Sequence, residues 1–277
     1  MHRDESEKAK SSPLVLQLTL FLLVAAGSFA VAFLQKDLAQ VFLFLAILPA
    51  TLWLYLFSRS TWVPALFFVL HAASLLFAKW LLPDLQFFIQ PHYIIAILAY
   101  CAVLLLFPRL RMYVHWFRAG SLDRLSWILI ALMTVFSAIA LALWATFVGA
   151  PHDFLRFVPR IPLWLLLLYG LLFPVLNALF EEFLARGVLY DGLMAVRNRA
   201  LFVIPAQALL FALWHYQGFP GGALGCLMVF VWSIFLGILR HRSGGMLAPL
   251  IAHFFADLSI GIILFVLVIY PAGHYQP

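Results

Sequence analysis

The run from Ile161 to Phe180 most limits how this chain can fold, because it contains no charged residue and ends directly before Glu181 and Glu182. An uncharged apolar run of about 20 residues is long enough to cross a bilayer as a helix. A charged side chain inside a bilayer costs about 3 kcal/mol even on lenient insertion scales. Two adjacent carboxylates at the end of such a run therefore indicate a functional site.

The composition of the whole chain agrees with this interpretation. Of its 277 residues, 66% are hydrophobic and 10% are charged, and the mean hydropathy is +1.06. These values predict an all-α polytopic membrane protein and exclude a large soluble domain. The net charge of +6 comes from basic residues scattered over short loops, so no nucleic-acid partner is expected. Cys101 and Cys226 lie inside apolar stretches and are interpreted as small packing residues.

Charged residues and turns divide the chain into nine apolar segments. The fourth and seventh are short, so eight or nine transmembrane helices are predicted. The segments are residues 13–34, 39–57, 62–78, 92–107, 125–149, 161–180, 200–215, 221–239 and 246–270.

The distribution of basic residues predicts the orientation in the membrane. With nine spans, most Lys and Arg residues fall on the side of the N-terminus, which predicts an inside N-terminus and an outside C-terminus in the cell membrane. The inner set is Arg3, Lys8, Lys10, Arg59, Arg109, Arg111, Arg118, Arg124, Arg186, Arg197, Arg199, Arg240 and Arg242, and the outer set is Lys36, Lys79, Arg156 and Arg160. The predicted organisation is a cytoplasmic tail (1–12), N-terminal spans of unknown role (13–160), a core that contains both glutamates (161–270) and a short tail (271–277).

Acidic residues are rare inside the apolar segments. Only Glu181, Glu182 and Asp257 lie within or at the edge of one, in the same third of the chain as His215 and His253. Counted from the inner basic residues along straight helices, all five reach a depth of about 16 to 24 Å. Three separate helices are therefore expected to bring these side chains to a common level. The other acids fall in the tail, in loops or at a helix end: Asp4, Glu5, Glu7, Asp37, Asp84, Asp123, Asp153 and Asp191.

The spacing within each segment predicts which side chains share a helix face. If the helix continues through the glutamates, Glu182 and Arg186 stand four residues apart and can pair, while Glu181 points about 100° away. His253 and Asp257 are also four residues apart. A carboxylate beside an imidazole can orient the ring and select its tautomer. The set offers a base, a second base or acid, and a possible oxyanion site.

Three ordered motifs carry a resemblance to a known family. They are Glu181-Glu182-x-x-x-Arg186, Phe211-x-x-x-His215 and His253-x-x-x-Asp257. Together they resemble the CAAX protease and bacteriocin-processing (CPBP) family of intramembrane glutamic endopeptidases, over about residues 161–270. The resemblance implies an all-helical membrane core that cleaves peptide bonds with activated water, without a metal, a cofactor or a covalent intermediate.

The same resemblance implies a role for each motif residue. Glu181 would be the general base, assisted by His215, with Glu182 and Arg186 supporting it, and His253 would stabilise the oxyanion. The family often has Asn at the position of Asp257, and an ionised aspartate cannot donate to an oxyanion. Either Asp257 is protonated or it orients His253, and we expect the second. Water must reach the site, so a polar-lined cavity open to the inner side is also expected.

Two other functions are compatible with the residues. Two histidines with Glu or Asp could bind zinc, although no His-Glu-x-x-His helix is present. The buried acids could instead form the relay of a proton-coupled transporter or belong to a scaffold, although no matching repeat occurs in the first half. The preferred prediction is an endopeptidase for membrane-anchored or hydrophobic peptides, with the lipid bilayer as its surroundings. Phe211 and His71 are interpreted as packing residues.

Overall fold

The computed structural model describes residues 13–31, 34–81, 91–149, 155, 158, 160–273 and 275. The predicted tail 1–12, and residues 274, 276 and 277 of the predicted C-terminal tail, lie outside the described residues. Within the described part of the chain, the regular elements are helices and no β-strand occurs. They are α1 (Leu14–Ala30), α2 (Lys36–Phe42), η2 (Leu43–Ile47), α3 (Leu48–Phe57), α4 (Arg59–Leu81), α5 (Pro91–Leu106), η3 (Pro108–Tyr113), α6 (Arg124–Phe147), α7 (Leu163–Glu182), η5 (Phe183–Leu189), α8 (Tyr190–Val196), α9 (Ala200–Trp214), η6 (His215–Gln217), α10 (Gly222–Ser243), α11 (Leu247–Leu264) and η7 (Phe265–Ile269).

The apolar helices match the nine predicted segments in order. Six stretches among the described residues are long and apolar enough to cross a membrane, and three further apolar helices are shorter. The chain is therefore a multi-pass membrane protein. The long stretches are Asp37–Phe57, Arg59–Ala78, Arg124–Phe147, Leu163–Val196, Gly222–Ser243 and Leu247–Ile269, and the shorter ones are Leu14–Ala30, Tyr93–Leu106 and Ala200–Trp214.

The chain divides into two compact units, the first of which contains Met1–Leu85, Gln90–His115 and Val188–Val203. In this unit α4 packs against α1, α3, α5 and α8. His71 of α4 is buried among aromatic rings, with Tyr93 and Phe29 each 5.0 Å away between ring centroids. These contacts agree with the predicted packing role. Asp191, which the sequence analysis grouped with the acids of the tail, loops and helix ends, lies in the first turn of α8. Its side chain is buried and accepts a hydrogen bond from the backbone N–H of His115 at 2.5 Å.

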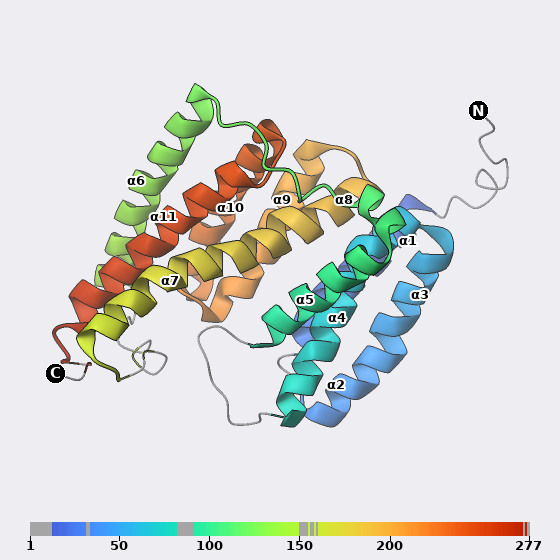
Figure 1. Ribbon diagram of the computed structural model, residues 1–277, viewed down its shortest axis with the longest axis horizontal. Coiled ribbons are helices and arrows are strands. Elements are labelled where there is room, and N and C mark those ends of the chain that lie inside the picture. Colours follow the sequence, from blue (N-terminus) through green and yellow to red (C-terminus); the bar gives the residue numbers. More distant parts are fainter. Residues whose placement is uncertain are drawn as a thin grey trace. The chain divides into compact units, whose positions relative to one another are not determined.

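The second unit contains Gln86–Ile89, Trp116–Gly187 and Ile204–Pro277. Here α11 lies alongside α7 and α6 and also packs against α10 (Figure 1). One part of its core joins α6, α10 and α11 through the buried residues Ile130, Met133, Leu236, Leu239, Ala248 and Ala252. The three motifs fall on α7, on the end of α9 and on α11, so this unit holds the predicted site residues.

The helix that carries the glutamates extends beyond Phe180, the last residue of the uncharged run. Helical structure continues from α7 through the π-helical turns of η5 into α8, so that Leu163–Val196 forms one stretch. The condition for pairing Glu182 with Arg186 is therefore met. Buried charges that pair with each other can remain inside such a helix.

A backbone contact fixes the start of α11. The N–H groups of Met246 and Leu247 donate to the carbonyls of Arg118 and Ala119, at 2.9 and 3.0 Å. A Cβ at Gly245 would overlap the backbone of the same loop, so a glycine is needed for this approach. The Arg-Ser-Gly-Gly sequence before α11 thus holds the helix that carries His253 and Asp257.

Candidate active site

The centre of the site is a buried ion pair on one helix. The Arg186 Nη1–H donates to Glu182 Oε1 at 2.8 Å, and both side chains are fully buried. This contact confirms the pairing that the four-residue spacing predicted. Two charges removed from solvent in this way need further partners, because the desolvation cost otherwise exceeds their attraction.

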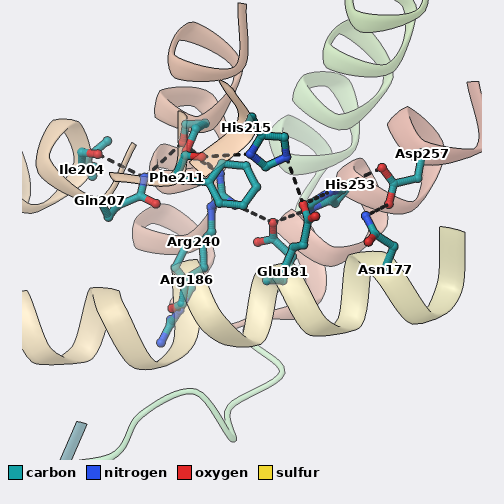
Figure 2. A network of polar contacts seen from close by, with 12 residues as sticks. Asn177, Glu181, Arg186, Ile204, Gln207, Phe211, His215, Arg240, His253 and Asp257 are labelled. Atoms are coloured by element: carbon teal, nitrogen blue, oxygen red, sulfur yellow. Dashed lines mark hydrogen bonds and ion pairs between the residues drawn. The ribbon is translucent and has the colours of Figure 1, made fainter. Parts of the chain in front are cut away.

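Arg186 finds those partners on α9 and α10. Its Nη2–H donates to Ser233 Oγ at 2.7 Å, and its guanidinium lies 4.6 Å from the centroid of the Phe211 ring. The Arg240 Nε–H donates to the carbonyl of Arg186 at 3.1 Å, within the π-helical segment (Figure 2). Gln207 Nε2–H donates to the carbonyl of Ser233 at 3.2 Å. The Phe211 ring packs against the Arg186 guanidinium, in agreement with the packing role expected for it.

His253 connects α11 to both glutamates. Its Nδ1 lies 2.6 Å from Glu182 Oε1, while its Nε2 lies 3.4 Å from Glu181 Oε2 and 3.6 Å from Asp257 Oδ1. A carboxylate accepts, so Nδ1 carries the proton in this contact. The sequence analysis expected Asp257 to orient this ring, but the shortest contact comes from Glu182. Glu182, the ion-pair partner of Arg186, therefore also holds the His253 imidazole.

Glu181 and His215 form a second, more open pair. Their closest atoms, Glu181 Oε2 and His215 Nε2, are 3.6 Å apart, and the side chains are 20% and 15% exposed. His215 Nδ1 lies 2.9 Å from the carbonyl oxygen of Phe211, which can only accept. In the neutral ring the proton is therefore on Nδ1, and Nε2 presents its lone pair toward Glu181.

Asp257 has a partner that the sequence analysis did not single out. Asn177 Nδ2–H donates to Asp257 Oδ2 at 3.1 Å, across the contact between α7 and α11 (Figure 2). Asn177 stands four residues before Glu181, so the two share a face of α7. That spacing was the only available signal, and a lone neutral residue in an apolar helix carries little weight.

All six predicted site residues thus lie in one connected cluster, from α7, η5, η6 and α11. These contacts confirm that separate helical segments bring the side chains together, and their common depth in a membrane stays a prediction. Not every buried polar atom is paired, since Glu182 Oε2, Arg186 Nε and Gln207 Oε1 lack a hydrogen-bond partner among the described residues. Within the same part of the chain, no group of three or more His, Cys, Asp or Glu side chains is arranged to hold a metal ion.

Comparison with known proteins places these residues in a family. Residues 162–259 match the family model described as type II CAAX prenyl endopeptidase Rce1-like. This part of the chain is an Rce1-like peptidase domain. The matched model is one of the CPBP family that the three motifs resemble, and the match spans all six predicted site residues. Searches of curated proteins and of solved structures gave no significant match.

An apolar groove of about 440 Å³ lies beside the helices that carry the polar cluster of the Rce1-like domain. It is lined by residues of α6, α7 and α11: Trp127, Val175, Ala178, Leu179, Leu250, Ile251, Phe254 and Phe255. Ala178 stands four residues before Glu182, and Phe254 follows His253, so the groove and the polar cluster share two helices. The polar-lined cavity expected on the inner side is a different feature and stays a prediction.

Proposed function

We propose that the Rce1-like domain is an intramembrane endopeptidase that uses a water molecule held between Glu181 and His215. The observation that carries this proposal is the 3.6 Å separation of Glu181 Oε2 and His215 Nε2. Two acceptors at this distance cannot bond directly, but a water molecule can donate one hydrogen to each. Both side chains are partly exposed, whereas the other charged groups of the cluster are nearly closed off.

In the proposed reaction, the water oxygen attacks the carbonyl carbon of the scissile peptide bond while Glu181 takes the water proton. The carbonyl oxygen becomes an oxyanion in the tetrahedral intermediate. The C–N bond then breaks, and the proton held by Glu181 passes to the leaving amine. His215 positions the water, because the Phe211 carbonyl fixes its Nδ1–H. The proposed reaction forms no covalent intermediate and consumes one water molecule for each peptide bond cleaved.

Glu182 and Arg186 take a supporting role in this scheme. Arg186 keeps a compensating charge beside Glu182, and Glu182 holds His253 through Nδ1. In its imidazolium form His253 also donates from Nε2, which lies 3.4 Å from Glu181 and so borders the reacting atoms. His253 is therefore proposed as a donor to the oxyanion, with Asp257 beside it.

The proposed substrate is a membrane-anchored or hydrophobic peptide. The family model is named for CAAX prenyl endopeptidases, and the apolar groove beside α7 and α11 has the chemistry to accept an aliphatic chain. The proposed setting is the cell membrane with the N-terminus inside, as the distribution of basic residues indicates. In this proposal residues 161–270 form the catalytic core, and residues 13–160 are N-terminal spans.

The proposal is tested by incubating purified protein in detergent with a panel of fluorogenic membrane-anchored peptides. The panel includes a farnesylated peptide ending in a CAAX sequence and its unmodified counterpart. Wild type, Glu181→Gln and His215→Ala are compared with and without a chelator. Cleavage that resists the chelator and disappears in both variants is expected. Cleavage lost with the chelator and restored by zinc would support the metal alternative, and cleavage retained in both variants would exclude the assigned pair.

A further inference from the structure

The surroundings of His253 are unusually acidic for a site that must stabilise an oxyanion. Three carboxylate oxygens, from Glu182, Glu181 and Asp257, lie 2.6, 3.4 and 3.6 Å from its two ring nitrogens. An ionised carboxylate repels a developing negative charge and offers it no hydrogen. Because Nδ1 is taken by Glu182, His253 has only Nε2 left to donate. A second donor is therefore needed close to Nε2.

Asn177 is a neutral donor that contacts the same Asp257 carboxylate as His253 Nε2. Its Nδ2 lies 3.1 Å from Asp257 Oδ2, and since a carboxylate accepts, the contact identifies the amide nitrogen as the atom facing Asp257. The NH₂ group has a second hydrogen, which this contact leaves free to donate. Asn177 is also four residues before Glu181 on the same face of α7, so the amide stands on the side of the helix where the attacking water is proposed.

We propose that Asn177 is a catalytic residue that donates its second N–H to the oxyanion, while Asp257 accepts the first and holds the amide in place. This assignment rests on the proposed peptidase function. It gives Asp257 a use that needs no proton on its carboxyl group. It also gives the two helices one donor each, His253 from α11 and Asn177 from α7.

The assignment is tested by a rescue experiment with the farnesylated peptide. We compare wild type, Asn177→Leu, Asp257→Asn and the double variant Asn177→Leu/Asp257→Asn. Removing one oxyanion donor lowers kcat by about 100- to 1,000-fold, so Asn177→Leu is expected to lose at least about 100-fold with little change in KM. In the double variant the amide at position 257 can donate instead, so its kcat is expected to exceed that of Asn177→Leu. A purely structural role for Asn177 predicts no such rescue.

Asn198→Leu is the matched control, since the same change is made at an exposed position outside the polar cluster. It is expected to leave kcat and the thermal unfolding temperature in detergent unchanged. A double variant no more active than Asn177→Leu, or an Asn177→Leu enzyme close to wild type, would overturn the assignment alone. If none of the proteins cleaves the peptide panel, the proposed peptidase function fails and the assignment fails with it.

Discussion

The two glutamates are neighbours in the sequence, yet their surroundings differ sharply. Glu182 is fully buried and bonded to Arg186 at 2.8 Å and to His253 at 2.6 Å. Glu181 is 20% exposed, and its nearest imidazole nitrogens lie 3.4 and 3.6 Å away. A turn of about 100° between adjacent helix positions is enough to separate them. One carboxylate is thereby held in the structure, and the other is the one proposed to bind water and exchange a proton.

The largest effect is expected from the open glutamate. Glu181→Gln should lower kcat by about 10²- to 10⁴-fold, the contribution of a positioned general base, with little change in the unfolding free energy. Initial rates on the cleaved peptide and SDS titration in mixed micelles measure the two quantities. A variant that unfolds much more readily than wild type would contradict the division between the two glutamates.

The buried glutamate should show the opposite balance. Glu182→Gln leaves the Arg186 guanidinium buried without its counter-charge, so the unfolding free energy should fall by about 3–5 kcal/mol. Glu181→Gln is the matched control because the same change is made one residue away. Arg186→Met should be similarly destabilising, with the exposed Arg199→Met as its control. Equal unfolding free energies of Glu182→Gln and Glu181→Gln would contradict a structural role for Glu182 that Glu181 lacks.

A smaller effect should come from the support behind the ion pair. Ser233→Ala removes the 2.7 Å hydrogen bond to Arg186 Nη2 and is expected to cost about 1–3 kcal/mol of unfolding free energy. Ser259→Ala, which loses only a local bond to the carbonyl of Phe255, should change it less. If both variants match wild type in SDS titration, Ser233 contributes nothing to holding Arg186.

The smallest effect is expected from the ion pair between Asp123 and Arg242, because both side chains are exposed. Arg242 Nη2 lies 2.6 Å from Asp123, where hydrogen bonds from Ser126 and from Arg242 lower the pKa of the carboxyl group from 3.8 to about 2. Because the folded pKa is lowered, the stabilisation is present above pH 3.8 and is lost as the pH falls toward 2. The difference in unfolding temperature between wild type and Asp123→Asn should shrink over that interval. A temperature difference independent of pH would argue against stabilisation by the ionised Asp123 side chain.

Much of the fold and part of the site could be predicted from the sequence. Long apolar runs leave few alternatives to helices in a membrane, and the nine helical segments followed from them. Charges inside such runs are costly, so Glu181, Glu182 and Asp257 stood out, and the four-residue spacing was sufficient to pair Glu182 with Arg186.

The tertiary structure decided which atoms meet. Asn177 and Ser233 are neutral and cost little in an apolar helix, so the sequence analysis did not single them out as partners of Asp257 and Arg186. Arg240 was counted as an inner-side charge, but α10 carries it to the backbone of Arg186, where it is buried. The assignment of His253 Nδ1 to Glu182 depends on how α11 packs against α7. Contacts between helices are set by packing over the whole unit, which local spacing along one chain segment does not determine.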